Sequence, residues 1–398
     1  MSGGRSATAA NPARSRDRRR AGFAAHVVRR SSRPLLGEKA GRSNGWLRTS
    51  MKDQRVDMAA VAAAAGVSKA TVSRALNNRG RISPATEERV RLVAKQLGYR
   101  PNLLASSLRQ QRTGTLGVVV SSLVSPFFAQ VVYGMESAAR RREYSLLLAC
   151  SEGEPHNERA QVELMLQKGV DGLLVFPTGA ANERFYTRLL QENIRLVFVD
   201  RHLRGVEVDV VETDNVAGGY LAAQHLIAHG RRRLAFLHVP PPERHNSSNW
   251  DRLAGGNRAL AEAGLPPARE LGAASEEALP EEEFGWSVME EFLASGGALD
   301  ALFTASDGLL YGAIRVLEQS GRSVPADVAV IGFDDKPVSR FFHPALTSVW
   351  QPMSEMGEEA VGLLVRRLQG PAAAPPQQRL LLAPRLVVRE SCGCPPRP

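Results

Sequence analysis

The sequence predicts an α/β protein with a small all-α unit near the N-terminus and a larger body of parallel β-sheets covered by helices. Two observations support this fold class. Apolar residues recur at helical spacing between residues 57 and 98. Beyond residue 113, short runs of Val, Leu and Ile alternate with helical stretches, which is typical of parallel sheets buried on both faces. A chain of 398 residues is long enough for two or three domains.

The N-terminal unit is expected to form three short helices. Asp57 is a plausible N-cap of the first helix, and Gly66 ends it in a left-handed turn. Ser68 can cap the second helix, and the pair Ser83-Pro84 starts the third. Two short helices joined by a glycine turn indicate a helix-turn-helix motif, whose second helix enters the DNA major groove. The alternative is an ordinary surface three-helix bundle with solvated charges.

The body is expected to begin near residue 113. Its predicted strands are the apolar runs "LGVVV", "SLLLA", "DGLLVF", "RLVFV", "RLAFLHV", "DALFT" and "DVAVIGF". Its predicted helices include residues 126–142, 156–168, 214–229, 251–264 and 306–320. A body of this size can form two parallel sheets rather than one.

Charge is distributed unevenly along the chain. Residues 1–50 contain 12 basic and 2 acidic residues, residues 51–112 contain 12 and 4, and the remainder contains 27 and 35. The basic front indicates a polyanionic partner, either nucleic acid or a membrane surface. Residues 1–50 lack sustained apolar periodicity, and we expect them to be disordered. They are a DNA-tethering arm, an Arg-rich targeting peptide, or an over-extended start with Met51 as the initiator.

Several classes of protein are disfavoured by the sequence. Three cysteines argue against a disulfide scaffold and fit a reducing cytosol, and no apolar stretch is long enough to span a membrane. Catalytic and nucleotide-binding motifs are missing, so we expect no enzyme, no cofactor and no metal site. The terminal "SCGC" has no second Cys or His pair nearby in sequence, and His225 and His229 fall on a helix expected to cover the sheet.

Two alternatives for function stay open on these grounds. A sugar-modifying α/β enzyme would turn over its substrate at a measurable rate. A nonspecific architectural DNA protein would lack the specificity ratio of about 10³ or more that a regulator shows.

A series of motifs resembles one family, the lactose-repressor (LacI/GalR) family of bacterial transcription regulators. The motifs include "AGVSKATVSRALNNRGRISPATEERV", "LGYRPNLLASSLR", "VETDNVAGGYLAAQHL", "FTASDGLLYGAIRVLEQSG" and "VPADVAVIGFDDKPVSRFFHPALTSVWQP". They occur in order and with the expected spacing, over about residues 56 to 391. The resemblance implies a repressor with a body like a periplasmic binding protein, made of two Rossmann-like subdomains.

The resemblance also implies domain boundaries. Residues 55–100 would be the DNA-binding domain and residues 101–112 the hinge helix and linker. The N-subdomain would take about 113–212 plus part of 344–391, and the C-subdomain about 213–343. The last residues, 392–398, would form a tail.

The DNA contacts implied by the resemblance fall in two regions. In the recognition helix, Lys69, Ala70 and Arg74 match base-reading positions. Positions that mostly contact phosphate are matched by Ser68, Thr71, Ser73 and Asn77, although a packing and capping role is equally open for Thr71. In the hinge helix, Asn102 matches the cap, and Ala105 and Leu108 match positions that enter the minor groove, with leucine as the wedge.

The effector site implied by the resemblance lies at the carboxyl ends of the strands. Its candidate residues are Phe127, Phe128, Asp200, Arg201, Ser248, Arg252, Trp286 and Asp307. An N-cap role for Asp307 and a domain-closing ion pair for Arg252 are the alternatives. Positive groups near the cleft, Arg201, Arg252 and Arg244, favour an anionic ligand such as a sugar acid or sugar phosphate.

The family resemblance finally implies the assembly. We expect a cytoplasmic homodimer on a pseudo-palindromic operator, controlled by a small metabolite. Residues 371–398 are rich in proline and lack the leucine heptad that the family's tetramers use.

Overall fold

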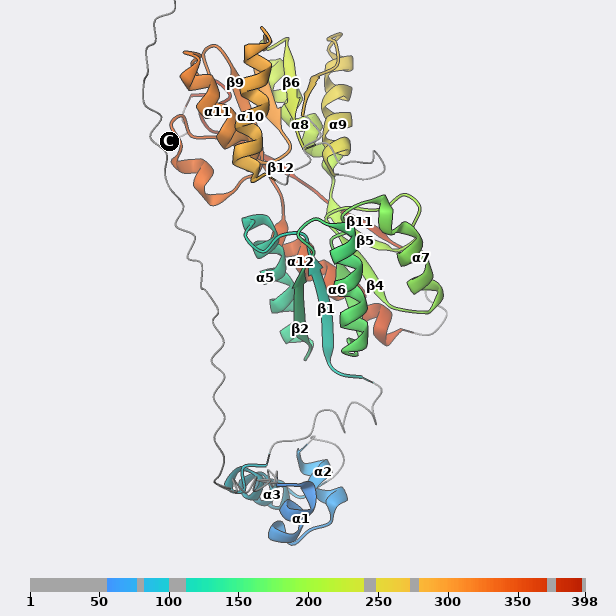
Figure 1. The fold of residues 1–398 in the computed structure, drawn as a ribbon. Coiled ribbons are helices and arrows are strands. Elements are labelled where there is room, and N and C mark those ends of the chain that lie inside the picture. Colours follow the sequence, from blue (N-terminus) through green and yellow to red (C-terminus); the bar gives the residue numbers. More distant parts are fainter. Residues whose placement is uncertain are drawn as a thin grey trace, which may run out of the picture. The chain divides into compact units, whose positions relative to one another are not determined.

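The computed structural model describes residues 56–76, 82–99, 112–239, 248–272, 279–370 and 377–395 (Figure 1). The chain forms two compact units, Met1–Arg100 and Pro101–Pro398. Within the described residues, no helix combines the length and the apolar character that a membrane span requires.

The first unit contains the three helices that its apolar spacing predicts. They are α1 (Met58–Ala65), α2 (Lys69–Leu76) and α3 (Pro84–Gln96). The Asp57 side chain accepts a hydrogen bond from the Ala60 N–H at 2.8 Å, and Gly66 ends α1 with a φ of 63°. The core of the unit consists of small apolar side chains from all three helices: Val61, Ala62, Ala65, Val72, Ala75, Val90 and Ala94.

The N-subdomain of the second unit is a six-stranded, fully parallel sheet in the order β11-β5-β4-β3-β1-β2. Its strands are β1 (Thr115–Val120), β2 (Ser145–Cys150), β3 (Gly172–Val175), β4 (Leu196–Val199), β5 (Asp209–Thr213) and β11 (Arg379–Leu382). One face is covered by α5 (Pro126–Arg141) and α12 (Met353–Gln369). The other face is covered by α6 (Pro155–Gln167) and α7 (Glu183–Gln191), which follows the short 3-10 helix η1 (Ala180–Asn182).

The C-subdomain is a second six-stranded sheet in the order β12-β10-β9-β8-β6-β7, and only β12 runs antiparallel to its neighbour. Its strands are β6 (Leu234–Leu237), β7 (Arg269–Leu271), β8 (Ala301–Thr304), β9 (Ala329–Asp334), β10 (Thr347–Trp350) and β12 (Arg385–Val387). Its helices are α8 (Asn215–Ala228), α9 (Ser248–Glu262), α10 (Glu281–Ala294), α11 (Asp307–Gln319) and the 3-10 helix η2 (Pro337–Phe341).

The chain passes between the two subdomains three times: after β5, after β10 and after β11 (Figure 1). Strands β10 and β12 belong to the C-subdomain sheet, whereas α12 and β11 belong to the N-subdomain. The predicted end of the C-subdomain at residue 343 therefore comes too early. Sequence spacing could not place these strands because each is short and lies beside a crossing.

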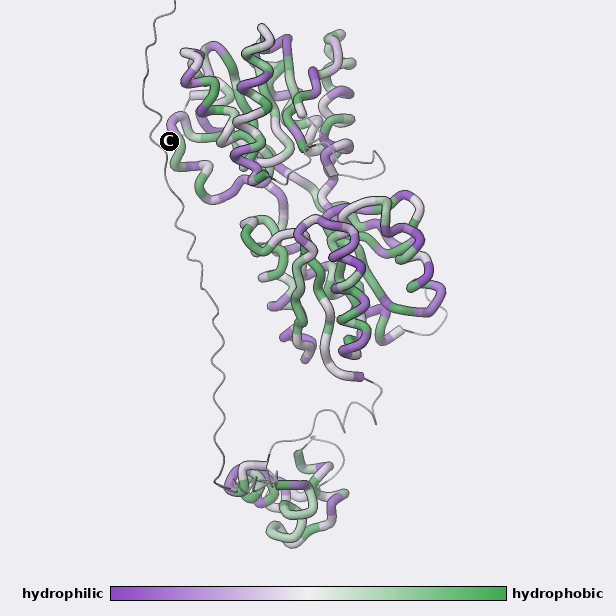
Figure 2. Tube along the Cα trace, viewed as in Figure 1, coloured by the Kyte–Doolittle hydropathy of each residue, from purple (hydrophilic) through white to green (hydrophobic). Residues whose placement is uncertain are grey.

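The hydrophobic cores follow the strands, which run as apolar stretches through the middle of both subdomains, while the helices turn polar residues outward (Figure 2). The C-terminal segment takes part in the C-subdomain core. Cys392 is completely buried, and the Ser391 hydroxyl donates a hydrogen bond to the Val330 carbonyl at 2.8 Å. The prediction that residues 392–398 form a tail is therefore wrong for residues 392–395.

Helices α8 and α9 pack at close range because each helix has a glycine that faces the backbone of the other. A Cβ atom at Gly219 would overlap the carbonyl oxygen of Arg252, and one at Gly255 would overlap the carbonyl oxygen of Val216. This close crossing fixes α9, and therefore Arg252, against the start of α8.

Candidate functional site

The exposed face of α2 carries the residues predicted to contact DNA. Lys69, Ala70 and Arg74 are exposed, whereas Val72 and Ala75 are buried and hold the helix on its unit. A helix that is held on its unit by small apolar residues and exposes cationic side chains on the opposite face has the form of an element that reads the major groove.

Ser68 and Thr71 are engaged with each other at the start of α2. The Ser68 hydroxyl accepts a hydrogen bond from the Thr71 N–H at 3.1 Å, and the two hydroxyl oxygens lie 2.9 Å apart. This geometry supports the capping role that the sequence left open for Thr71. Ser73 is half-buried on the same helix. Some predicted residues lie outside the described part of the chain: the DNA contacts Asn77, Asn102, Ala105 and Leu108, and Arg244, which was predicted to lie near the cleft.

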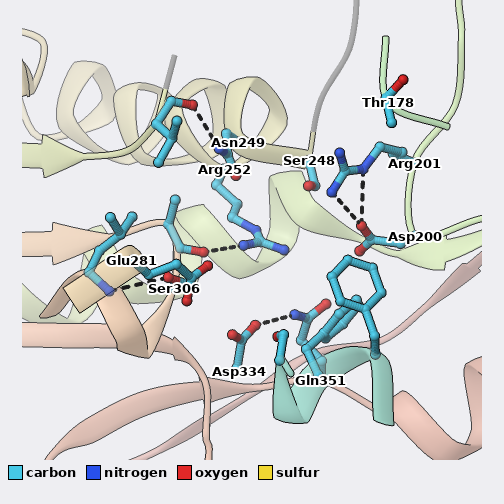
Figure 3. A pocket seen from close by; sticks show the side chains of 16 residues that line it. Thr178, Asp200, Arg201, Ser248, Asn249, Arg252, Glu281, Ser306, Asp334 and Gln351 are labelled. Carbon is cyan, nitrogen blue, oxygen red and sulfur yellow. Dashed lines mark hydrogen bonds and ion pairs between the residues drawn. The ribbon is translucent and has the colours of Figure 1, made fainter. Parts of the chain in front are cut away.

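A cavity of about 320 Å³ lies between the two subdomains, where the carboxyl ends of their strands face each other (Figure 3). Its walls come from both sheets and their helices. The lining residues are Ser125, Phe127, Phe128, Thr178, Asp200, Arg201, Val239, Ser248, Asn249, Arg252, Glu281, Ala305, Ser306, Leu309, Asp334 and Gln351. The volume falls at the lower end of the range of small-molecule sites, about 300–1,000 Å³.

Asp200 and Arg201 form a pair at the cavity wall, directly after β4. The Arg201 Nε and Nη2 atoms each donate to Asp200 Oδ2 at 3.1 Å. The Asp200 side chain is buried, while that of Arg201 is 24% exposed. The backbone of Asp200 has a φ of 71°, a conformation that is costly for a residue with a side chain. This turn points the pair into the cavity (Figure 3).

Arg252 enters the cavity from α9 and is buried. Its Nε donates to Asn215 Oδ1 at 2.9 Å, its Nη1 donates to the Ala305 carbonyl, and its guanidinium lies 3.7 Å from the Phe333 ring centroid. Burial lowers the pKa of Arg252, and the nearby Asp334 and Asp200 carboxylates oppose this effect. Asn215 and Ala305 both belong to the C-subdomain, so these hydrogen bonds do not close the two subdomains on each other.

Asp334 and Gln351 are cavity residues that the sequence analysis missed. The Gln351 Nε2 donates to Asp334 Oδ1 at 2.7 Å, and Lys336 Nζ lies 3.6 Å from Asp334 Oδ2. Burial raises the pKa of Asp334 to about 7, although Lys336 and Arg252 lower it. The signal available in the sequence was the "GFDD" at the end of β9, where Asp334 takes a φ of 105°. The other lining residues that were missed are Ser125, Thr178, Val239, Asn249, Glu281, Ala305, Ser306 and Leu309.

Asp307 does not lie on the cavity wall, contrary to the prediction. Its side chain is completely buried, and its Oδ1 accepts a hydrogen bond from the Ser348 hydroxyl at 2.7 Å. Its Oδ2 accepts from the Ser339 hydroxyl at 2.7 Å and from the Lys336 N–H at 2.8 Å. The N-cap of α11 is Ser306, so Asp307 is not the cap either. Burial raises the pKa of Asp307 to about 6, against the lowering effect of these hydrogen bonds.

Trp286 also lies apart from the cavity. It lines an apolar groove on α10 and α11 together with Tyr311 and Phe342. The remaining predicted residues, Phe127, Phe128 and Ser248, do line the cavity. The Phe128 ring packs edge-on against both Phe127 and Phe176 at centroid distances of 5.1 and 5.2 Å, which fixes it at the wall.

Comparison with known families identifies both units. The family of bacterial regulatory proteins of the lacI type matches residues 57–102, and the periplasmic binding protein-like domain matches residues 223–392. The HTH-type transcriptional regulator CelR of Thermobifida fusca is 37% identical over 346 residues, covering 85% of this chain and 98% of the relative. The ribose operon repressor of Escherichia coli K12 is 33% identical over 335 residues, covering 83% of this chain and 98% of the relative.

Solved structures agree with these relatives. The Lac repressor dimer bound to operator and the anti-inducer ONPF has a TM-score of 0.75 at 27% identity, covering 85% of this chain and 99% of that one. The complex of the transcriptional regulator CelR with cellobiose has a TM-score of 0.62 at 34% identity, covering 85% of this chain and all of that one. These relatives are transcriptional regulators and not enzymes. The chain therefore belongs to the lacI family of bacterial regulatory proteins.

Proposed function

We propose that the chain is a sequence-specific repressor that binds a pseudo-palindromic operator as a homodimer, and that a small neutral sugar in the cavity controls its affinity for DNA. The observation that carries the proposal is the presence, in one chain, of the exposed cationic face of α2 and a polar cavity between two sheets. The activities named for its relatives, repression of the ribose operon and operator binding by the Lac repressor dimer, support it.

Helix α2 is the proposed reading element. The Arg74 guanidinium can donate two parallel hydrogen bonds to O6 and N7 of guanine, and Lys69 offers a single cationic donor. Ala70 can only make apolar contact with a thymine methyl group. All three side chains are exposed on the free face of the helix, which leaves them available to base edges.

Two further groups of residues complete the proposed DNA contacts. Ser68, Thr71, Ser73 and Asn77 would position the helix by contacting phosphate, without reading sequence. In the hinge, Asn102 would cap a short helix whose Ala105 and Leu108 enter the minor groove, and the leucine wedge would unstack one base step.

The charge balance of the cavity favours a neutral ligand. Two arginines, Arg201 and Arg252, share the lining with the three carboxyl groups of Asp200, Glu281 and Asp334. Arg201 is paired with Asp200, so its charge is already compensated. This balance argues against the sugar acid or sugar phosphate that the arginines alone suggest.

The chemistry of the lining suits a sugar. Carboxyl, guanidinium, amide and hydroxyl groups line the wall and can accept from or donate to ligand hydroxyls (Figure 3). The Phe127 and Phe128 side chains, which also line the cavity, offer apolar surface to C–H groups. The solved CelR relative is a complex with cellobiose, and another relative is a ribose operon repressor.

Because the cavity is lined from both subdomains, a bound ligand would bias their relative orientation about the three crossings. The ligand can change DNA affinity only as far as it binds the two orientations with different affinity. A repressor of a bacterial promoter would work in the cytoplasm, where the chromosome lies.

Exposed apolar side chains on the body support the dimer. Val124 is 94% exposed and Tyr133 is 71% exposed, and Trp286 lines the apolar groove on α10 and α11. The groove on α10 and α11 is the apolar surface of this set that a partner could cover, since single exposed apolar side chains are common on monomers. Residues 377–395, the described part of the C-terminal region, form β11, β12 and a turn.

The test begins with selection of duplexes from a randomised pool by the full-length protein. We expect two inverted half-sites, two chains per duplex, and specific binding about 10³-fold or more above random competitor. Absence of an enriched site would contradict the proposal. A thermal-shift screen with cellobiose, ribose and glucose 6-phosphate then tests the ligand: stabilisation by the phosphate alone would reject the neutral sugar.

A further inference from the structure

Imidazole and thiol groups come together where the C-terminal end of α8 meets the last described residues of the chain. None of these residues lines the cavity. His225 lies in the last turn of α8 and His229 is its C-cap, so the two rings stand one turn apart with centroids 4.6 Å from each other. The Cys394 Sγ lies 3.5 Å from His225 Nε2 and 3.2 Å from His229 Nε2. The three potential ligand atoms all lie within 4.8 Å of one another.

Cys392 adds a second thiol beside this group. Its side chain is completely buried, it lies beside His225 and Cys394, and the Thr347 hydroxyl donates to its sulfur at 3.1 Å. The Cys392 sulfur is not among the ligand atoms that all lie within 4.8 Å of one another. Gly393, between the two cysteines, takes a φ of 95°, a conformation open to glycine that turns the chain between the two thiols.

The distances match those of a coordinated metal. Tetrahedral zinc with Zn–S bonds of about 2.3 Å and Zn–N bonds of about 2.0 Å separates a sulfur from a nitrogen ligand by about 3.5 Å. The two sulfur–nitrogen distances in this structure are 3.5 and 3.2 Å. Simple hydrogen bonding requires one imidazole to donate and the other to accept at the same sulfur, whereas a cation satisfies both with neutral rings.

We propose that His225, His229 and Cys394 bind a thiophilic divalent transition metal, Zn²⁺ by its ligand set, and that the neighbouring Cys392 thiol turns toward the ion as the fourth ligand. Two imidazoles and two thiolates are a common donor set for structural zinc, and the absence of carboxylates from this group disfavours Ca²⁺ and Mg²⁺. With Cys392 as the fourth ligand the coordination shell would be closed, so the ion would hold the C-terminal segment on α8 and would not be catalytic.

The local environment suits this donor set. Thr347 supplies a hydrogen bond to the Cys392 sulfur from outside the donor set, as outer partners of metal ligands commonly do. His229 is exposed, so an ion can reach the site from solvent.

Cobalt(II) titration of the reduced, metal-free full-length protein tests the proposal. We expect one equivalent to bind per chain, with the visible bands of tetrahedral cobalt and a near-ultraviolet thiolate charge-transfer band, and Zn²⁺ to displace it. Cys394→Ser and His229→Ala should each weaken zinc binding at least tenfold. The matched control Cys150→Ser changes a thiol of the other subdomain and should bind as the wild type does.

Folding of the variants is checked separately, by far-ultraviolet circular dichroism and by denaturant unfolding without metal. Zn²⁺ should raise the melting temperature of the wild type and of Cys150→Ser but not of the exposed-site variant His229→Ala. The proposal is overturned by an octahedral cobalt spectrum, by binding that survives both site variants, or by a Cys392–Cys394 disulfide in metal-free protein isolated from the cell. None of these outcomes bears on DNA binding, because the site does not rest on the proposed function.

Discussion

Asp307 is bound to Ser348 across the C-subdomain: its carboxylate accepts a 2.7 Å hydrogen bond from the serine hydroxyl, and this joins the start of α11 to β10. Together with the bonds from Ser339 and from the Lys336 N–H, it uses both carboxylate oxygens inside the protein. Asp307 therefore acts on the cavity by holding β10 and the Lys336 segment in place, and not by facing a ligand.

Replacement of Asp307 by alanine should destabilise the protein. The change leaves two buried hydroxyls and one buried N–H without their acceptor, which we expect to cost about 3 kcal/mol of unfolding free energy. Denaturant unfolding of the body measures it. The exposed Glu290→Ala on α10 is the control and should stay within about 0.5 kcal/mol of the wild type. A fully stable Asp307→Ala that has lost only its ligand response would restore the role predicted from sequence.

The pH dependence of stability should reflect Asp334. Its pKa is about 7 in the folded protein, against about 4 for an ordinary carboxyl group. Between these values the folded state binds more protons than the unfolded state, so the unfolding free energy falls as pH rises from about 4 to about 7. Asp334→Asn removes this contribution and should show a shallower fall. Asp307, whose pKa is raised in the same direction, supplies the remaining slope.

The prediction is tested by measuring the unfolding free energy of the wild type and of Asp334→Asn between pH 4 and pH 7, the range of about 4 to about 7 given above. The exposed Glu290→Gln should keep the wild-type slope. Parallel curves for Asp334→Asn and the wild type would show that Asp334 titrates normally in the folded protein.

Arg74 should carry base recognition. Arg74→Ala should cost about 1–3 kcal/mol of specific affinity and relax preference at one base pair of each half-site. Arg89→Ala removes one exposed charge from α3 of the same unit and should weaken specific and nonspecific binding alike. Anisotropy titrations with selected and with random duplexes measure the loss of specific and of nonspecific affinity separately for each variant. Equal losses on both duplexes for Arg74→Ala would exclude base reading.

Gly219 should be intolerant of any side chain. A methyl group there overlaps the Arg252 carbonyl oxygen, so Gly219→Ala must push α9 away from α8. We expect a loss of about 1–3 kcal/mol in stability from overpacking, with weaker ligand binding because Arg252 moves. Gly230→Ala, near the end of α8 where a Cβ meets open space but φ is 83°, is the comparison: it should lose stability and retain ligand affinity.

The sequence predicted what depends on local pattern. The caps Asp57 and Ser83 and the turn at Gly66 fixed three helices to within a residue or two, and strand ends such as "VFVD" placed Asp200 and Arg201 at the cavity. The predictions for Asp307 and Trp286 failed because they required the direction in which each side chain points from its helix. Hydrophobic periodicity does not specify that direction for a single polar or aromatic residue.

Long-range pairings were likewise invisible in the sequence. His229 and Cys394 are 165 positions apart, and only the return of the chain through β12 brings them together. Asp334 and Gln351 meet because β9 and β10 are neighbours, a pairing that follows from sheet order and not from spacing.

The most direct measurement is an anisotropy titration of the selected operator with wild type and Arg201→Ala, each with and without the neutral sugar found by thermal shift. Arg201→Ala leaves the buried Asp200 carboxylate without its charged donor, so the unfolding free energy of the variant is measured alongside and the titration is run where the variant is fully folded. We predict that the sugar changes wild-type operator affinity by about 5–150-fold, the usual span of allosteric coupling, and that Arg201→Ala needs at least tenfold more sugar for the same change. Operator affinity that ignores every cavity ligand, or an identical sugar response in both proteins, would contradict control of DNA binding from this cavity.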